Sequence, residues 1–401
     1  MTEPLYFDDP LTLEFTAQVS ECRPLQGGRF GLLLPRTYFY PTSGGQEHDT
    51  GFIGTARILE VIKDDDHILH ITDHPLPPGE YPARIDRERR LRAMQHHTAQ
   101  HILSAAFLEV AGIDSLSANI NGYTPSTIDL DVGEAPPETL RRAETLANRI
   151  FFENRAVKTY HITQDEIARL PVRKPPKVSE RIRIVEVEGF DYTPCGGTHC
   201  PSTGMVGLLK IVKTGRVNQK LRVHFVAGYQ ALDYFSRYQD VTQQAAALLE
   251  TGWEGLPAAL TRRLEQFQAL QSDLETLRAR LLAAEADQLA ASALITDSPS
   301  GKAMRLVTAS FRGRPAAELR ALALELRKKS ALAALLASYE GGKLSLVAAC
   351  APDTGLDARV LLQKHLAPLN LRGGGDASLA QGGGNVDEKR FESFLTDASK
   401  L

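Results

Sequence analysis

The stretch that most constrains this chain is residues 191–200, which read DYTPCGGTHC. It places Cys195 and His199 on a loop with two glycines, in a protein that has only four cysteines in 401 residues. Gly196 and Gly197 give the backbone the freedom to turn tightly, so both side chains can face inward. Two ligands do not complete a metal site, and the remaining ligands must therefore come from another part of the chain.

A second pair of candidate ligands lies on a predicted helix. From residue 86 the sequence reads DRERRLRAMQHHTAQHILSAAFLEVAG, with apolar residues at intervals of three and four, and Gly112 ends the pattern. His97 and His101 are four residues apart, so their imidazoles project from one face of this helix. Such a pair is also common at surfaces and helix caps. Combined with the two loop ligands it supplies three nitrogens and one sulfur, a set that suits one tetrahedral Zn²⁺ ion per chain.

Composition excludes several classes of function. A hydrophobic fraction of 43% with 24% charged residues is typical of a soluble globular protein. The formal net charge of −3 means that contacts to nucleic acid must come from local basic patches, which argues against DNA coating. The sequence has neither a signal-peptide pattern nor a run of about 18 apolar residues. We therefore expect a cytoplasmic protein with reduced thiols and with neither membrane nor DNA as a partner.

The sequence predicts an α/β (α+β) protein with four parts. Residues 1–86 alternate polar and apolar positions between turns, which predicts a small β-barrel or curled sheet, and contain the glycine-rich motif YFYPTSGGQEHDTG. Residues 87–238 combine helices with an antiparallel or mixed sheet and hold the candidate metal ligands. Residues 239–296 carry leucines at intervals of three and four, which predicts a helical hairpin or a coiled-coil stalk. Residues 297–401 predict a separate small α/β domain containing a glycine-rich loop.

The motifs resemble those of a known family. HHTAQHILSAAF, STIDLD at 126–131 and CGGTHC at 195–200 are similar to the editing domain shared by alanyl- and threonyl-tRNA synthetases and the freestanding AlaX proteins. The glycine-rich motif at 38–51 resembles that of the alanine branch. LRGGGDASLAQGGG at 371–384 resembles the signature of the DHHA1 domain, which ends alanyl-tRNA synthetases and the long AlaX proteins. No stretch before the barrel could hold an amino-acid-activating domain, so the chain resembles a freestanding editing protein.

The resemblance implies hydrolysis of the ester that joins a wrong amino acid, serine or glycine, to tRNA-Ala. A synthetic pocket rejects such similar amino acids weakly, so a second, hydrolytic site restores accuracy. Zinc would bind the substrate or polarise a water molecule. Four protein ligands nevertheless make a closed site of the structural type. We expect either that water or substrate replaces one ligand, or that zinc positions the substrate while backbone N–H groups and ordered water do the chemistry.

The resemblance and the charge pattern also suggest binding residues. The pocket candidates are Gln100, Thr127, Asp129, Thr42, Gly44 and Gly45. Capping, strand-edge hydrogen bonding and an ordinary turn are the alternative roles for these positions. The candidate contacts to tRNA phosphates are Arg87, Arg89, Arg90, Arg92, Lys174, Lys177, Arg372, Gly373, Gly374, Gly375, Gly382, Gly383 and Gly384. Charged runs are also typical of solvated faces, and glycine-rich loops of tight packing.

Two other functions fit parts of the sequence. One is a tRNA-binding or dimerising accessory protein whose zinc only stabilises the fold, and the other is threonyl-type editing. The helical stalk and the C-terminal domain allow a homodimer, although the same apolar pattern fits a helix that packs on its own chain. The glycine-rich motif at 38–51 and the C-terminal domain favour the alanine type.

Overall fold

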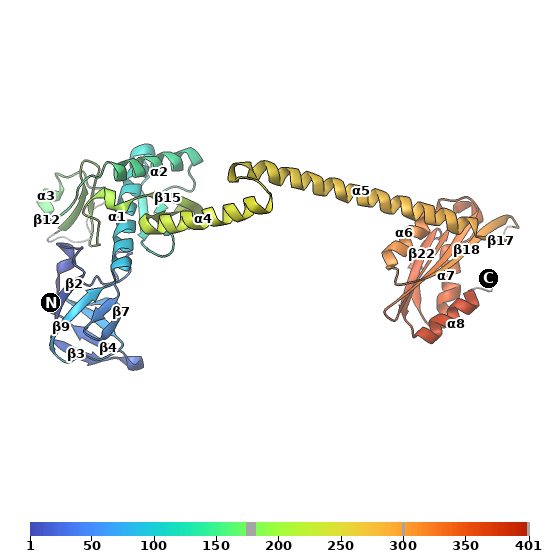
Figure 1. The fold of residues 1–401 in the computed structure, drawn as a ribbon, viewed down its shortest axis with the longest axis horizontal. Helices are drawn as coiled ribbons and strands as arrows, with labels where there is room; N and C mark the ends of the chain where they lie inside the picture. The colour runs from blue at the N-terminus through green and yellow to red at the C-terminus, as the bar shows by residue number, and fades with distance from the viewer. Residues whose placement is uncertain (174–181, 299–300, 399–401) are drawn as a thin grey trace. The chain divides into compact units, whose positions relative to one another are not determined.

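The computed structural model describes residues 1–173, 182–298 and 301–398, which form a mixed α/β structure (Figure 1). The chain divides into two compact units, Met1–Leu248 and Leu249–Leu401. Eight α-helices and several β-sheets lie within the described residues. None of these helices is long and apolar enough to cross a membrane.

The N-terminal strands form one antiparallel seven-stranded sheet with the order β2-β9-β6-β7-β8-β4-β3. The sheet is a half-barrel, in line with the small β-barrel or curled sheet that the sequence predicted, because within the described residues its two edge strands pair with different neighbours and not with each other. Apolar side chains alternate along the strands and pack into one core. The strands are β2 (Glu14–Val19), β3 (Glu21–Pro24), β4 (Phe30–Leu33), β6 (Gly51–Ile53), β7 (Ala56–Asp64), β8 (His67–Thr72) and β9 (Gly79–Ile85). Two short segments, β1 (Glu3–Pro4) and β5 (Arg36–Thr37), pair separately in parallel.

Helix α1 (Arg87–Ala111) follows the sheet and begins and ends where the sequence predicts. The Asp86 side chain accepts a hydrogen bond from the backbone N–H of Arg89 at 3.1 Å, which caps the first turn. Gly112 adopts the left-handed conformation, with φ +66°, that ends many helices. The middle of α1 is buried on all sides, so polar residues there must find partners inside the protein.

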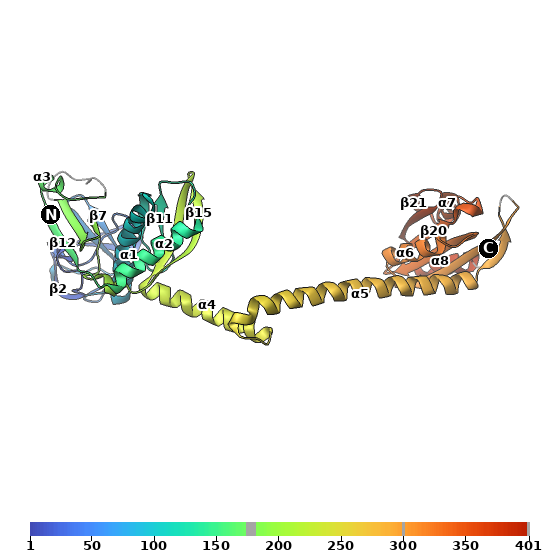
Figure 2. The same ribbon diagram turned by 90° about the horizontal axis from the view of Figure 1, so that it is seen from above.

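Two further sheets surround α1. The four-stranded sheet has the order β10-β11-β16-β15, and its inner face packs on α1 and α2 (Pro137–Phe152), as Figure 2 shows. The three-stranded sheet has the order β12-β13-β14. Helix α4 (Gly228–Leu248) closes this unit, and the expected part boundary at 238 falls inside it. The remaining elements are β10 (Ser115–Asn119), β11 (Ser126–Leu130), β12 (Val157–Ile162), α3 (Gln164–Ile167), β13 (Ile182–Val187), β14 (Asp191–Pro194), β15 (Leu209–Val217) and β16 (Lys220–Ala227).

The second unit starts with the long helix α5 (Leu256–Ala291), close to the predicted stalk helix. A six-stranded sheet follows, with the order β17-β18-β19-β20-β22-β21. One face packs against α6 and the end of α5, and the other against α7 and α8. The elements are β17 (Leu294–Asp297), β18 (Ala303–Arg312), α6 (Ala316–Arg327), β19 (Leu332–Glu340), β20 (Lys343–Cys350), α7 (Ala358–Leu366), β21 (Arg372–Gly375), β22 (Leu379–Asn385) and α8 (Glu388–Ala398).

The glycine-rich stretch at 371–384 is not the loop that the sequence predicted. It forms β21 and β22, which pair antiparallel with Gly373 opposite Gly382. A Cβ atom on Gly373 would lie 2.7 Å from Cδ1 of Leu366 in α7, and a Cβ atom on Gly382 would lie 2.6 Å from the same atom. Tight packing of the hairpin against α7 therefore requires glycine at both positions.

Candidate metal centre

Four side chains from two distant segments converge beside α1. His97 and His101 project from one face of the helix, and Cys195 and His199 lie on the loop that follows β14. Their ligand atoms all lie within 4.8 Å of one another. The Cys195 Sγ atom is 3.4 Å from Nε2 of both His97 and His199. A tetrahedral zinc ion with ordinary bond lengths would hold sulfur and nitrogen ligands about 3.5 Å apart, so the residues fit such an ion.

Each candidate imidazole has a polar partner at its other nitrogen. Nδ1 of His97 lies 2.8 Å from Oε1 of Gln46, and Nδ1 of His199 lies 3.3 Å from Oγ1 of Thr98. Nδ1 of His101 faces a carboxylate oxygen of Asp191 at 3.5 Å. These partners orient the rings so that the three Nε2 atoms point toward one place, which is what metal-binding histidines need.

Asp191 is itself held in a buried network. The Arg173 Nε atom donates to Asp191 Oδ1 at 3.1 Å, and the Thr193 hydroxyl donates to the other oxygen at 2.9 Å. Arg173 also donates to Ser115 Oγ at 3.0 Å. Burial alone would raise the pKa of Asp191, but the contacts with His101 and Arg173 outweigh it and lower the pKa to about 2. Asp191 is therefore a permanent anion behind the His101 ring.

The three imidazoles make the Cys195 sulfur a good metal ligand. Burial disfavours the thiolate, yet the charge interactions of the sulfur with His97, His199 and His101 bring the pKa of Cys195 well below its usual value. Burial lowers the pKa of His101, but the Cys195 thiolate and the Asp191 carboxylate raise it to about 8. A thiolate surrounded by imidazoles is the charge arrangement that a bound cation would neutralise.

The Arg183 side chain holds the loop that carries Cys195 and His199. The Arg183 guanidinium donates to the backbone carbonyls of Cys195 at 2.8 Å and Gly197 at 3.1 Å. The Gly197 N–H donates to Cys195 Sγ at 3.3 Å. A Cβ atom on Gly197 would lie 2.1 Å from Cε1 of His97, whereas one on Gly196 would meet nothing within 4 Å. Only the second glycine is thus required by the approach of the loop to the helix.

Comparison with known proteins shows what this chain is similar to. Residues 182–222 match the Threonyl and Alanyl tRNA synthetase second additional domain, and this segment contains the cysteine loop. The whole chain is 31% identical to the alanine–tRNA ligase of Methanosarcina mazei, of which it covers 44%. The alanine–tRNA ligase of Ignicoccus hospitalis is 34% identical over 69% of this chain and 31% of that protein. The chain is therefore related to alanyl-tRNA synthetases over its whole length.

This alanyl-tRNA synthetase-related protein spans less than half the length of these curated relatives. Among solved structures, the C-Ala domain of Aquifex aeolicus alanyl-tRNA synthetase matches with 26% identity and a TM-score of 0.23. That match covers 26% of this chain and 96% of the C-Ala chain.

The predicted pocket residues lie in three places in the structure. Gln100 is buried in α1 and donates to Ser104 Oγ at 2.9 Å. Thr127 and Asp129 alternate along β11 with Ser126, Ile128 and Leu130, which are buried, so they lie on the sheet face opposite α1. Asp129 is paired there with Arg222, with its oxygens 2.6 and 2.8 Å from the guanidinium.

The glycine-rich motif lies next to the candidate metal centre. Within it the Thr42 hydroxyl is 3.0 Å from Nδ1 of His48. Gly44 and Gly45 adopt positive φ angles of +59° and +85°. A Cβ atom on Gly45 would come within 2.6 Å of the carbonyl oxygen of Ala118, so the motif packs closely on β10.

The predicted RNA-binding residues differ in exposure. In α1, Arg87 is exposed, whereas Arg90 is 1% exposed and bound to Asp49. Arg89 donates to Glu47 and to the carbonyl of His48, and Arg92 is paired with Glu88 and Asp233. Arg372, Gly373, Gly374 and Gly375 lie in β21 and are exposed, and Gly382, Gly383 and Gly384 lie in β22. Lys174 and Lys177 lie outside the described residues.

Sequence reasoning did not assign the residues that hold the candidate ligands. Gln46 lies inside the glycine-rich motif, and Asp191 opens the stretch that ends in the cysteine loop. Thr98 immediately follows His97. Their positions within or beside the recognised motifs were the sequence feature that could have indicated a role at the site. The partner of each side chain, however, depends on the tertiary fold.

Proposed function

We propose that this protein is a trans-editing hydrolase that deacylates tRNA-Ala carrying serine or glycine. The observation that carries the proposal is the convergence of His97, His101, Cys195 and His199 in a chain related to alanine–tRNA ligases. The proposed cofactor is one Zn²⁺ ion, because three imidazoles and one thiolate are a typical zinc donor set.

Bound zinc would supply a fixed positive charge for binding the substrate or polarising its ester. The chain itself contributes orientation. Gln46, Thr98 and Asp191 hold the three imidazoles, and Arg183 holds the carbonyls of the cysteine loop. Cys195 is the least buried of the four candidate ligands, so we infer that the 3′ end of the tRNA approaches from its side.

We further propose that the second unit binds the tRNA backbone. A groove of about 520 Å³ runs along β20, β21 and β22, and its lining includes the exposed cations Arg320, Lys343 and Arg372. Because the net charge of the chain is −3, a local cluster of this kind is what phosphate contacts require. Arg87 at the start of α1 is a further proposed contact.

The test is deacylation of purified Ser-tRNA-Ala, Gly-tRNA-Ala and Ala-tRNA-Ala by the protein, its chelated form and a Cys195→Ala variant. We expect rapid release of serine or glycine, slow release of alanine, and loss of activity in both the chelated and the variant samples. Equal hydrolysis of all three substrates, or none by folded and zinc-loaded protein, would contradict the proposal.

Two alternatives follow from specific observations. Four protein ligands are the closed set of a structural zinc site, which favours an accessory protein that only binds tRNA. The matched domain is described for both threonyl- and alanyl-tRNA synthetases, so threonyl-type editing is the second alternative. Adding Ser-tRNA-Thr to the assay separates the enzymatic alternatives, and tRNA binding without hydrolysis identifies the accessory role.

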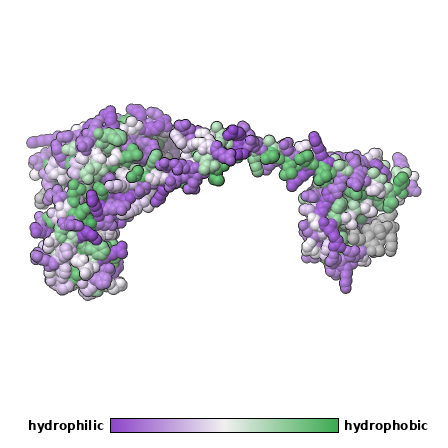
Figure 3. Space-filling view, viewed as in Figure 1, coloured by the Kyte–Doolittle hydropathy of each residue, from purple (hydrophilic) through white to green (hydrophobic). Residues whose placement is uncertain are grey.

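We also propose that α5 mediates a homodimer. Hydrophobic side chains lie along this helix (Figure 3), and seven of them, spaced by three or four residues, are 49–70% exposed. This spacing matches the apolar seam of a coiled coil. The residues are Leu260, Leu264, Phe267, Leu270, Leu274, Leu277 and Leu281.

A further inference from the structure

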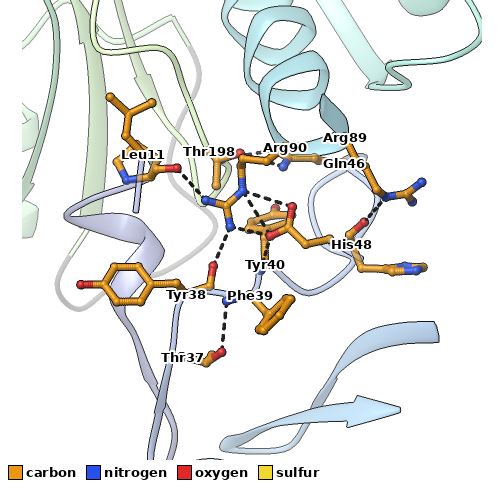
Figure 4. Close-up of polar contacts among 12 residues, drawn as sticks. Leu11, Thr37, Tyr38, Phe39, Tyr40, Gln46, His48, Arg89, Arg90 and Thr198 are labelled. Carbon is orange, nitrogen blue, oxygen red and sulfur yellow. Dashed lines mark hydrogen bonds and ion pairs between the residues drawn. The ribbon is translucent and has the colours of Figure 1, made fainter. Parts of the chain in front are cut away.

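One side chain of the N-terminal glycine-rich motif reaches a candidate metal ligand. Gln46 is 1% exposed and lies beside Thr198 (Figure 4), and both ends of its carboxamide are bound. Its Oε1 atom accepts a hydrogen bond from the backbone N–H of Thr198 at 3.2 Å and lies 2.8 Å from Nδ1 of His97. Its Nε2 atom donates to the Thr198 hydroxyl at 2.8 Å. Gln46 therefore links His97 in α1 to the loop that carries Cys195 and His199.

The hydrogen bonds determine the protonation of His97. A backbone N–H can only donate, so the Gln46 atom that faces Thr198 N–H must be the carbonyl oxygen. The same oxygen faces Nδ1 of His97, and this nitrogen must therefore carry the proton. Nε2 of His97 is then the unprotonated nitrogen, and it faces Cys195 Sγ at 3.4 Å. This is the tautomer that a metal needs.

The segment Tyr40–Asp49 is anchored so that Gln46 has little freedom. Asp49 forms a buried ion pair with Arg90, which lies seven residues before His97 and thus two turns away on the same face of α1. The second anchor lies on the edge of the neighbouring sheet, where the carbonyl of Gly45 accepts a hydrogen bond from Ile120 N–H at 2.7 Å. The segment is therefore fixed on both sides of Gln46.

We propose that Gln46 is a positioning residue of the metal centre, which makes the half-barrel part of the site. It acts through His97, by fixing the ring orientation and tautomer, and through Thr198, by fixing the cysteine loop. The inference rests on the proposed zinc site but not on the reaction. Its consequence is that zinc affinity depends on a residue about 50 positions away from the nearest ligand in sequence.

The test measures zinc affinity by competition with a chromophoric chelator, in full-length Gln46→Ala and Gln46→Glu variants. Removing a partner of a metal-binding histidine typically weakens metal binding 10- to 100-fold, so we expect about that loss for Gln46→Ala. Glutamate keeps an acceptor for both His97 Nδ1–H and Thr198 N–H, and the Thr198 hydroxyl can donate to it. We expect Gln46→Glu to recover most of the affinity.

Gln95→Ala is the matched control. Gln95 is also buried in this unit and bonds to the backbone, through Met205 O at 3.0 Å and Tyr229 N–H at 3.2 Å, but it touches none of the candidate ligands in the described residues. We expect this variant to bind zinc as the unmodified protein does. The visible spectrum of the Co²⁺-loaded proteins should change for Gln46→Ala and not for Gln95→Ala, which separates a change at the metal from general destabilisation.

Unchanged zinc affinity and Co²⁺ spectrum in folded Gln46→Ala would overturn the inference, as would an equal loss in Gln95→Ala or a failure of the unmodified protein to bind zinc. If Gln46→Ala does not fold, the zinc affinity and the Co²⁺ spectrum are measured for Gln46→Glu and Gln46→Met instead. An intact site in Gln46→Glu together with a disrupted site in Gln46→Met supports the positioning role of Gln46. Zinc binding that depends on Gln46 in a protein without deacylase activity would contradict only the proposed function.

Discussion

At the scale of single residues, Gly197 shows how closely the cysteine loop approaches α1. A Cβ atom there would lie 2.3 Å from Nδ1 of His97 and 3.0 Å from Oε1 of Gln46. We expect Gly197→Ala to displace the His97 ring, weaken zinc binding and lower the free energy of unfolding by about 1–3 kcal/mol, as overpacking usually does. Zinc titration and urea unfolding measure both effects.

Gly196→Ala is the control for this substitution, because its Cβ atom would have no neighbour within 4 Å. We expect it to keep both zinc affinity and stability. Equal effects of the two alanine substitutions would mean that backbone freedom, rather than space, explains the paired glycines.

His70 provides a residue-scale prediction about pH. Its ring lies in the half-barrel core, between the Thr37 hydroxyl at 2.9 Å and the carbonyl of Leu32 at 3.3 Å. Burial lowers the pKa of His70 from 6.5 to about 4, although the carbonyls of Leu32 and Ile68 oppose this shift. Between these two values the unfolded chain binds a proton that the folded protein does not. The stability contributed by neutral His70 is therefore complete above pH 6.5 and is lost as the pH falls toward 4.

The expected loss from His70 between pH 7.5 and pH 5 is about 2 kcal/mol. Urea unfolding of the unmodified protein and of His70→Gln at both pH values separates the contribution of His70 to stability from that of the other titrating groups. The variant should show a smaller pH dependence, and an identical pH dependence in both proteins would rule out the assignment.

The four candidate metal ligands could be predicted from their spacing together with the resemblance to a known family, and the structure brings them together. Two histidines four apart share a helix face, and a cysteine and a histidine around two glycines share a tight loop. The partners of these ligands were not predictable in the same way. Gln46 reaches His97 and Asp191 faces His101 only because the half-barrel and β14 pack on α1.

At the scale of elements, the Arg90–Asp49 pair attaches α1 to the half-barrel. Both side chains are almost fully buried, and Arg90 also donates to the carbonyls of Pro10 and Tyr38. Removing one partner leaves an uncompensated buried charge, so we expect Asp49→Ala to cost about 3–5 kcal/mol. The double variant Arg90→Met/Asp49→Leu should cost less than Asp49→Ala alone. Urea unfolding of the three proteins tests this order, and a larger cost for the double variant would contradict it.

Some elements were predictable from local sequence and others were not. Asp86 and Gly112 define the ends of α1 because capping and the left-handed C-terminus are local effects. The strands β21 and β22 were not expected, because a run of glycines has low strand propensity and normally indicates a loop. Close contact with Leu366 of α7 and pairing with β20 override that local preference, and only the tertiary structure reveals either contact.

Helix α5 carries the prediction about assembly. Leu274 is 49% exposed and lies in the middle of the apolar series, so a charge at this position should disrupt a coiled coil without affecting a core. We expect the unmodified protein to sediment as a dimer and Leu274→Glu to sediment as a monomer in analytical ultracentrifugation. Asp273→Lys, at the neighbouring position outside the series, should remain dimeric. A monomeric unmodified protein would refute the dimer.

At the scale of the whole molecule, the two units should respond differently to zinc. All four candidate ligands belong to the unit Met1–Leu248, and none belongs to Leu249–Leu401. A ligand that binds only the folded state stabilises it by about 2.7 kcal/mol at a concentration 100 times its Kd. For a unit of this size, that energy corresponds to a rise in Tm of roughly 5–10 °C.

Differential scanning calorimetry of the full chain with and without zinc should therefore show two transitions, of which only one moves. In Cys195→Ala neither transition should move, because that variant lacks the thiolate, and this comparison assigns the moving transition to the first unit. A single transition, or an equal shift of both, would mean that the units unfold together. Zinc bound near α1 would then also stabilise the groove at Arg372, and metal binding would be coupled to the proposed tRNA-binding surface.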